Sequence, residues 1–381
     1  MVGGGHSWSR INAPEDMWIT LDRLNGVVAR SATDVTVHGG TRLATLLAVL
    51  GDATLPIVGS ISAQSIAGLI ATGTHGSSLV HGNLASLVTR VRLVKADGSV
   101  LDLDVTDPRF EGVRVHLGAL GVVTAVTLAI EPKFQLAEMV EHVAIEDLPA
   151  QIEAIAASAE YVKVWWMPHY NRAQIFRYER TSDATTGNPV RRRWLDDHVM
   201  HRFAFPVVAR LARVPGMAAR ISRYVAKSFV GPRRVGPSAL MLSTPMPFRH
   251  RETEAALPMA KAGEAIDRLA RALAGGEFRI NFPMEIRFVK GDRAWLSPAF
   301  GGDTCQIGAY CQGPSATPYF AAFWREMRAL SARPHWGKEL DHHSDDVRVL
   351  WPEARRFLAL RDELDPERRF ASDFHTRVLG S

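Results

Sequence analysis

The first 130 residues alternate short apolar strands with glycine-rich turns. Residues 33–38 alternate polar and apolar positions, which predicts a half-buried strand ending at Gly39-Gly40. Leucines then recur at helical spacing, which predicts a helix over 41–50. We expect a second helix over 63–71, with Ser62 as its N-cap. Further strands are expected at 89–95, 100–105 and 122–130, the first two joined as a hairpin by the turn 96–98.

After Pro132 the pattern changes to longer amphipathic segments between strands. The periodicity predicts helices at 147–160, 262–273, 318–330 and 353–364, and strands at 161–167, 173–179, 284–289 and 304–312. The end of the chain is expected to be a loop. Mixed strands and helices without an internal repeat indicate an α+β protein of two domains.

The composition is that of a globular protein, with 46% hydrophobic and 22% charged residues among 381. No apolar run reaches the roughly 18 residues that a membrane span needs. The start, MVGGGHSWSR, lacks the basic and apolar regions of a signal peptide. Two cysteines are too few for a disulfide framework. We therefore expect a soluble, cytoplasmic protein.

The net charge of +5 is concentrated in residues 191–234, which hold eleven Lys and Arg but only two acids. A nucleic-acid-binding protein is basic over a whole face, so we expect no nucleic acid partner. Within this insertion, residues 202–229 place basic side chains among apolar ones at short intervals. One interpretation is a helix that lies on anionic lipid, peripheral at the inner membrane face. The other, favoured by the interruptions at Pro206 and Pro215, is a surface helix with solvated arginines.

Three consecutive glycines, Gly3, Gly4 and Gly5, precede His6 and Ser7. Without Cβ atoms in the way, backbone N–H groups can converge on a phosphate. No Gly-Lys-Ser/Thr sequence follows, so this is not a Walker loop. A plain turn explains the glycines more simply, and the triplet alone is weak evidence.

A stronger signal is GSISAQSIAGLIATGTHG at residues 59–76, where hydroxyl side chains stand among glycines. These are Ser60, Ser62, Ser65, Thr72 and Thr74. Such a small, hydrogen-bonding lining suits a long cofactor that carries phosphates.

An acid and a base share one face of the expected strand MEIRFV. Met284, Ile286 and Phe288 face one side, so Glu285 and Arg287 face the other. They form either part of a site or an exposed ion pair worth under about 1 kcal/mol, and spacing alone favours the exposed pair.

A metal cluster is not expected. Cys305, Cys311, His342 and His343 lack the spacing of zinc ligands, and an apolar strand pair and a solvated loop explain them.

Taken in order over nearly the whole chain, several segments resemble the aldonolactone oxidases. They are GGGHSWS at 3–9, GSISAQSIAGLIATGTHG at 59–76, GALGVVTAVTLAIEP at 118–132, EIR at 285–287, RPHWGK at 333–338 and RFASDFHTRVLG at 369–380. This family comprises FAD enzymes with the vanillyl-alcohol-oxidase fold, among them L-gulonolactone oxidase, D-arabinono-1,4-lactone oxidase and alditol oxidase. The insertion at 191–234 is the part that the resemblance does not explain.

The resemblance implies a PCMH-type FAD-binding domain at 1–133, a substrate domain at 134–332 that carries the basic insertion, and a C-terminal segment at 333–381 that returns to the flavin. In the family a first FAD subdomain precedes the GGGHS loop, whereas here the loop follows two residues. We therefore expect an FAD-binding domain that lacks this first subdomain. The alternative function is that of an impaired, truncated relative that acts as a binding or interaction protein.

The resemblance also implies the roles of individual residues. FAD is expected to contact Gly3, Gly4, Gly5, His6, Ser7, Gly59, Ser60, Ile61, Gln64, Gly68, Thr72, Gly73, Thr74, His75, Gly76, Gly118, Gly121, Val122 and Val123. Glu285 would orient substrate hydroxyls, and the forked, permanently charged Arg287 would hold the lactone or alkoxide oxygen. Lys338 would lie near the flavin or the substrate oxygens, framed by His335 and Trp336. For His335, a structural role is the alternative to a catalytic one.

The implied reaction is oxidation of a CH–OH group of a sugar-1,4-lactone or polyol by hydride transfer to flavin N5, with electrons passed to oxygen or another acceptor. Many members join FAD covalently through the histidine that corresponds to His6, while packing beside the flavin ring is the alternative. Gly59 falls where oxygen reaches the flavin in this family, which favours an oxidase. A positive φ in the turn after Pro56 is the competing explanation of that glycine.

Overall fold

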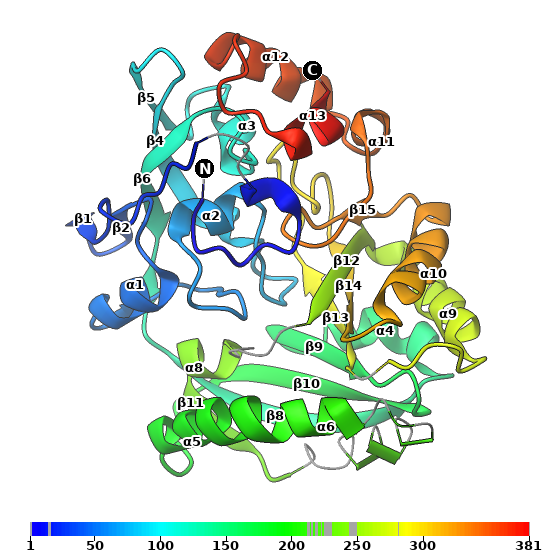
Figure 1. Ribbon diagram of the computed structural model, residues 1–381. Coiled ribbons are helices and arrows are strands. Elements are labelled where there is room, and N and C mark those ends of the chain that lie inside the picture. Colours follow the sequence, from blue (N-terminus) through cyan, green and yellow to red (C-terminus); the bar gives the residue numbers. More distant parts are fainter. Residues whose placement is uncertain are drawn as a thin grey trace.

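The structure of the protein, a computed structural model, describes residues 2–13, 17–211, 214, 216–217, 220–221, 223–224, 231–243, 250–280 and 282–380. They contain a five-stranded and an eight-stranded sheet, with a small two-stranded sheet beside them. Figure 1 shows the two larger sheets in different parts of the molecule, with the N-terminal loop next to helix α2.

The five-stranded sheet comes from the first 130 residues and has the order β1-β2-β6-β4-β5 with antiparallel neighbours. Its strands are β1 (Val27–Arg30), β2 (Asp34–His38), β4 (Val88–Val94), β5 (Val100–Asp104) and β6 (Val122–Ala129). The helices of this part are α1 (Leu43–Val49), α2 (Ile66–Ala71) and α3 (Phe110–Arg114), and β3 (Ala53–Thr54) pairs with β7 (Glu131–Pro132). Short 3₁₀ turns lie at Arg10–Asn12 and Leu84–Leu87.

The eight-stranded sheet has the order β11-β8-β10-β9-β13-β14-β12-β15, again with antiparallel neighbours. Its strands are β8 (Gln135–Ala144), β9 (Tyr161–Trp166), β10 (Arg172–Thr181), β11 (Arg234–Pro237), β12 (Arg251–Pro258), β13 (Met284–Val289), β14 (Thr304–Cys311) and β15 (Arg333–Pro334). Strands distant in the sequence therefore lie next to one another.

The two faces of this sheet have different neighbours. Helices α4 (Leu148–Ala156), α9 (Ala262–Leu273) and α10 (Ala316–Ala329) cover one face, where Val164, Ile286 and Ile307 belong to their apolar core. On the opposite face, Tyr161 and Tyr178 join the core of the first sheet. Because side chains alternate along a strand, Glu285 and Arg287 lie on the face toward the first sheet.

The C-terminal residues return to the first core as helices. They are α11 (Ser344–Leu350), α12 (Ala354–Leu364) and α13 (Asp373–Leu379), which place Trp351, Phe357 and Phe374 in that core. The expectation of a looped end is wrong, because α13 buries Phe374 and Val378, four residues apart on one face.

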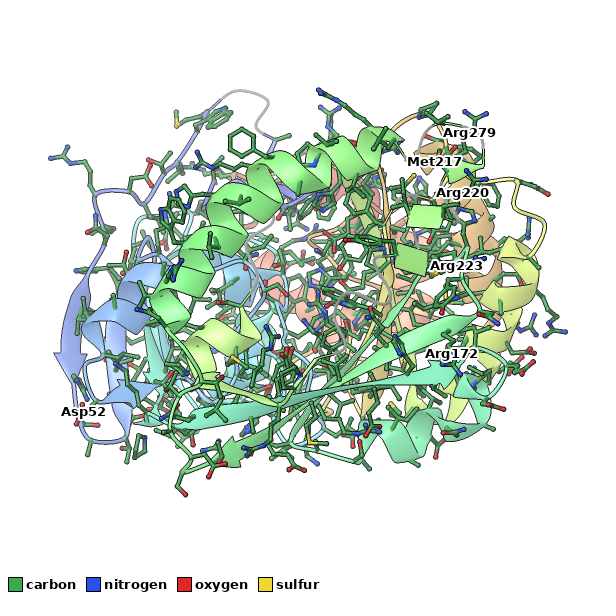
Figure 2. The ribbon with its side chains drawn as sticks, turned by 90° about the horizontal axis from the view of Figure 1, so that it is seen from below. Asp52, Arg172, Met217, Arg220, Arg223 and Arg279 are labelled. Atoms are coloured by element: carbon green, nitrogen blue, oxygen red, sulfur yellow. The ribbon has the colours of Figure 1, made fainter. Side chains whose placement is uncertain are left out.

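The basic insertion contains a long helix on the outside of the eight-stranded sheet (Figures 1 and 2). It consists of α5 (Pro189–Leu195), a π-helical stretch over Asp196–Ala204 and α6 (Phe205–Leu211), and α8 (Ser238–Leu242) follows β11. Met217, Arg220 and Arg223 follow its end in Figure 2. Of the segment 202–229, residues 212–213, 215, 218–219, 222 and 225–229 lie outside the described residues.

Most expected elements are confirmed, two of them, 262–273 and 284–289, with the same bounds. Helix α2 begins later than expected, at Ile66, and its N-cap residue is Ser65 rather than Ser62. Strands β8 and β12 were not expected, and β12 carries part of the candidate site.

Candidate active site

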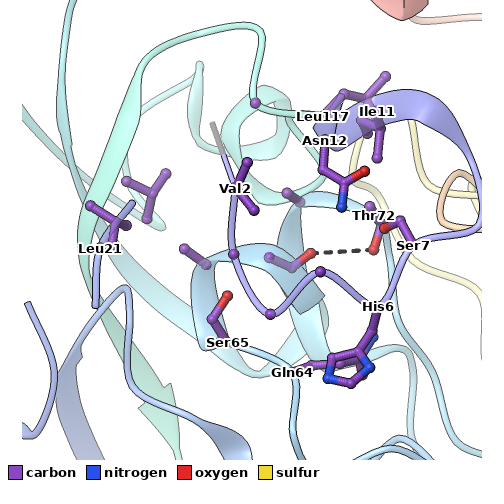
Figure 3. Close-up of a pocket in the computed structure, with 18 of the residues that line it drawn as sticks. Val2, His6, Ser7, Ile11, Asn12, Leu21, Gln64, Ser65, Thr72 and Leu117 are labelled. Carbon is purple, nitrogen blue, oxygen red and sulfur yellow. Dashed lines mark hydrogen bonds between the residues drawn. The ribbon is translucent and has the colours of Figure 1, made fainter. Parts of the chain in front are cut away.

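The N-terminal loop lies directly against helix α2, as Figure 3 shows. A Cβ atom on Gly3 would lie 2.3 Å from the Oγ of Ser65, so an alanine there would force the Ser65 hydroxyl to turn away. Within the described residues, the backbone N–H groups of residues 3–7 donate no hydrogen bond, and the buried Oγ of Ser65 has no partner. A buried hydroxyl is normally satisfied, so Ser65 Oγ has room for a hydrogen bond with a ligand, and the exposed or half-buried loop adds free N–H donors beside it.

This loop lines two cavities. The first, with about 750 Å³ of empty space, is lined by Val2–Ser7, by α2 and by the turn at His116–Gly118. The second, called here the central cavity, has about 550 Å³ of empty space, open solvent included, and reaches the eight-stranded sheet. His6, Ser7, Gln64 and Thr72 line both, so the two cavities adjoin. Together they offer a long site that runs from the N-terminal loop to the sheet.

Most of the expected cofactor residues lie in these walls. The first cavity is lined by Gly3, Gly4, Gly5, His6, Ser7, Gln64, Gly68, Thr72, Gly118 and Val123, and the central cavity adds Ser60, Ile61, Thr74 and His75. Gly76 lines a third cavity beside the central one.

Four expected residues, Gly59, Gly73, Gly121 and Val122, line none of these three cavities. Gly73 and Gly121 have positive φ, so glycine meets a backbone requirement there. Gly59 does not have a positive φ; instead a Cβ on it would lie 2.7 Å from the Cγ2 of Thr74. The explanation of Gly59 by a positive φ is therefore wrong, and its neighbour Thr74 excludes a side chain.

Glu285 and Arg287 form a buried pair, with 5% and 9% of their surfaces exposed. The Nη2 of Arg287 donates to Glu285, and the carboxylate also accepts from Trp165 Nε1 at 3.0 Å and from the Tyr310 hydroxyl at 3.1 Å. Burial opposes ionisation, but Arg287 and the nearby Lys163 lower the pKa of Glu285 to about 2. The alternative of an exposed ion pair is excluded.

Neighbouring strands extend this polar face. Arg287 pairs with Lys163 of β9, and Glu252 of β12 pairs with Tyr310 of β14. Glu252 and Glu254 are both fully buried and line the central cavity with Tyr310. These three residues were not among the expected site residues. The alternation of Glu252, Thr253 and Glu254 is typical of a strand. A face that carries two acids is not typical of a buried strand, however.

Lys338 is held from two sides. Its Nζ forms an ion pair with Glu252 and lies 4.6 Å from the centre of the Trp8 ring. The backbone N–H of Trp8 donates to Gly337 O at 2.8 Å, which joins the N-terminal loop to the segment that carries Lys338. Burial opposes the ionisation of Glu252, but Lys338 lowers the pKa of Glu252, so this carboxyl group stays ionised.

Two histidines complete the wall of the central cavity. His75 Nε2 lies 3.0 Å from the carboxylate of Glu254, whose pKa His75 holds well below its usual range against the effect of burial. Burial lowers the pKa of His335 to about 3, so this ring is neutral near pH 7. Its Nδ1 accepts from Gly337 N at 3.0 Å, which leaves the proton on Nε2.

Trp336 does not frame the cavity. It is fully buried in the first core and stacks on Trp351 with ring centres 4.6 Å apart. In the described part of the chain, the one group of three side chains close enough to hold a metal is His75, Glu254 and His335, with ligand atoms within 4.8 Å. The cysteines and histidines considered from the sequence are not in that group.

The site fits FAD. The free N–H groups of residues 3–7 and the unpaired Ser65 hydroxyl suit phosphate oxygens, because oriented backbone amides bind anions. The adjoining cavities provide length, and the far end holds Arg287 and Lys338, the charged groups needed where an alcohol loses a hydride.

These features define an FAD-dependent oxidoreductase. The FAD binding domain family matches residues 1–104, and the D-arabinono-1,4-lactone oxidase family matches residues 126–378. The chain belongs to the D-arabinono-1,4-lactone oxidase family. The expected cofactor, FAD, is confirmed, and an interaction protein without catalysis is not favoured.

Relatives match over the whole length. The chain is 30% identical to L-gulono-1,4-lactone dehydrogenase from Mycobacterium tuberculosis over 100% of its own length and 90% of that protein. It is 32% identical to alditol oxidase from a Streptomyces species, over 98% and 89%. Among solved structures, cholesterol oxidase from Brevibacterium sterolicum has a TM-score of 0.80 at 18% identity, over 99% of this chain and 89% of that one. That likeness confirms the expected FAD-binding fold.

Proposed function

We propose that this protein oxidises a CH–OH group of a sugar-1,4-lactone. The proposal rests on one observation: Arg287 and Lys338 line the same cavity as His6, Ser7 and Thr74, which are expected to contact FAD. Both relatives named above act on hydroxyl-rich compounds, one a lactone and the other an alditol by their names. A polyol is therefore the second substrate class to test.

Several side chains bind and orient the substrate near the carbon that is oxidised. Bound FAD supplies the acceptor for the hydride. Ionised Glu285 accepts a hydrogen bond from a substrate hydroxyl and orients it, and Arg287 donates to the lactone or alkoxide oxygen. Of the guanidinium nitrogens only Nη2 donates to a described residue, so Nε and Nη1 have N–H groups for substrate. Lys338 places a cation beside His6 and Ser7, where negative charge develops.

The test is turnover of the FAD-loaded protein on matched substrates. We expect oxidation of aldono-1,4-lactones, with loss of activity in Glu285→Gln. Phe288→Leu is the control, because Phe288 lies on the opposite, helix-covered face of the same strand. Turnover of alditols alone would favour the polyol, and turnover of neither class would refute the proposal.

FAD attachment through His6 is a second part of this proposal. His6 lines both cavities, and burial and Arg42 lower its pKa, so a neutral nitrogen is available to bond the flavin methyl group. Acid precipitation is expected to carry the yellow colour into the pellet, and His6→Ala to leave it in the supernatant. A colourless pellet from flavin-loaded wild type would mean that His6 only packs beside the ring.

Oxygen is the proposed electron acceptor, and Gly59 is proposed to leave room for its approach to the flavin. A Cβ there meets only the Cγ2 of Thr74 at under 3 Å, so Thr74→Ser removes this collision. If Gly59 gates oxygen, Gly59→Ala slows flavin reoxidation by air, and the added Thr74→Ser leaves reoxidation slow. If the double variant reoxidises as fast as wild type, the glycine serves packing against Thr74 and not oxygen access.

We propose that each of three segments of the chain has its own role. Residues 1–133 would hold FAD, 134–332 would bind substrate, and 333–381 would return to the flavin with Lys338. The structure's five-stranded sheet lies in the first range and its eight-stranded sheet spans the second, with β15 in the third.

We also propose that the cytoplasmic protein binds anionic lipid through the helix of the basic insertion. No helix among the described residues is long and apolar enough to cross a bilayer. The helix instead exposes a row of apolar side chains, Val190, Trp194, Val199, Phe203, Val207 and Leu211, beside exposed Arg202 and Arg210. Apolar and basic groups together suit an anionic membrane surface.

Vesicle sedimentation tests this surface. We expect pelleting with phosphatidylserine vesicles, weak pelleting with phosphatidylcholine vesicles, and loss of both in the double variant Trp194→Ser, Phe203→Ser. Val349→Ser is the matched control, since Val349 is 83% exposed on α11. A wild type that stays in the supernatant with both vesicles would leave the helix as a solvated surface element.

A further inference from the structure

A second buried cation lies next to Arg287. Lys163 on β9 is the cross-strand partner of Arg287 on β13, and both point to the face of the sheet that carries the candidate site. The Nζ of Lys163 lies 4.8 Å from the ring centre of Trp165 and 5.2 Å from that of Phe176. These aromatic faces hold the ammonium group in place.

Lys163 opens into a third cavity, called here the side cavity, with about 380 Å³ of empty space. Its polar lining includes Ser60, Ser77, Lys163, Tyr178, Glu285 and Arg287. Ser60 and Arg287 also line the central cavity, so the side cavity adjoins the place where the substrate carbinol is expected. Apolar side chains, among them Ile57 and Met241, complete its lining.

The charges around the side cavity do not balance. Arg287 and protonated Lys163 are two cations side by side, and Glu285 is the negative neighbour of both. Glu285 already accepts from Arg287, Trp165 and Tyr310, whereas Lys163 forms no hydrogen bond or ion pair with any described residue. Burial is the largest effect on Lys163 and lowers its pKa. A buried ammonium without a hydrogen-bonding partner is costly, unless a ligand supplies the acceptor.

We propose that the side cavity is a subsite for a carboxylate at the end of the substrate remote from the oxidised carbon, with Lys163 as its specificity-determining residue. This inference rests on the proposed function, because it assumes that the reacting carbinol lies in the central cavity. A carboxylate supplies the acceptor that Lys163 lacks, and it restores charge balance beside Arg287. The preferred substrate is therefore a sugar-acid lactone with a second acidic group rather than one that ends in a neutral CH₂OH.

The test compares an aldaro-1,4-lactone, which ends in a carboxylate, with the aldono-1,4-lactone of the same configuration. We expect wild type to have the higher kcat/KM on the acidic lactone. Lys163→Met keeps the length and apolar contacts of the side chain but removes its charge. It is expected to lower the ratio of kcat/KM values, acidic to neutral, at least about tenfold, the size of one charge-assisted hydrogen bond.

Lys290→Met is the matched control, because Lys290 is exposed just after the end of the same strand, β13. An unchanged ratio in Lys163→Met, with neutral lactone still oxidised, would refute the subsite and leave the proposed function standing. If neither lactone is oxidised, the proposed function is refuted. The subsite is then tested separately, by measuring how far each lactone raises the melting temperature of the FAD-loaded protein. If the acidic lactone raises the melting temperature of wild type but not of Lys163→Met, the subsite is supported. Equal rises in both proteins would overturn the subsite.

Discussion

Replacing Arg287 by Met tests the candidate site most sharply, because it should separate stability from catalysis. Arg287 donates to Glu285 inside the protein, and its removal leaves the carboxylate with Trp165 and Tyr310 as donors. Removing one partner of a buried pair costs about 3–5 kcal/mol. Loss of one preorganised donor to a developing oxyanion costs about 3–4 kcal/mol, or about 10²–10³ in kcat. FAD should remain bound, since the cradle at residues 3–7 is unchanged.

Two companion variants separate these effects. Arg287→Lys keeps the cation but loses the fork, so we expect a smaller loss of kcat than in Arg287→Met. Adding Glu285→Gln to Arg287→Met removes the unpaired charge, so stability should recover while activity does not. The assay is kcat/KM on the best lactone, together with the melting temperature and the bound flavin absorbance. An Arg287→Met protein within twofold of wild-type kcat/KM would show that the site is elsewhere.

Three further results are expected. Gly3→Ala lowers the amount of FAD bound, since its Cβ would lie 2.3 Å from Ser65 Oγ, and adding Ser65→Ala restores part of it; equal flavin content in all three proteins would contradict the cradle. Glu252→Gln frees Lys338 and lowers kcat more than it raises KM, whereas a purely structural role would lower only the melting temperature. Burial lowers the pKa of His375 to about 4 from 6.5, so the unfolded chain binds more protons between these values and the melting temperature should rise with pH there. His375→Gln should flatten this rise, and an unchanged slope would contradict it.

The sequence was most informative where one physical signal dominated. Helix α9 has apolar residues at helical spacing, and β13 alternates, so both were predicted with the observed bounds. Strand β12 was missed because its inner face carries Glu252 and Glu254 instead of apolar residues. Those acids are buried only because Lys338 and His75, far away in the sequence, are their partners.

The candidate site could also be predicted from the sequence only in part. Alternation placed Glu285 and Arg287 on one face, but whether that face is buried depends on the first sheet packing against it. The resemblance to a family identified Lys338, which no local pattern distinguished from an ordinary surface lysine. Lys163 had no signal of its own, because its importance comes from the register of β9 with β13.

Anaerobic mixing of the FAD-loaded protein with aldono-1,4-lactones tests the central claim most directly. The protein is expected to transfer a hydride from the lactone carbinol, so the visible absorbance of oxidised flavin should bleach in a single turnover and one equivalent of ketolactone should form. Glu285→Gln and Arg287→Met should bleach far more slowly at equal flavin content, because Arg287 binds the carbinol oxygen and Glu285 accepts from Arg287 and orients a substrate hydroxyl. Flavin that stays oxidised with every lactone and alditol, in a protein that is folded and loaded with FAD, would contradict the account.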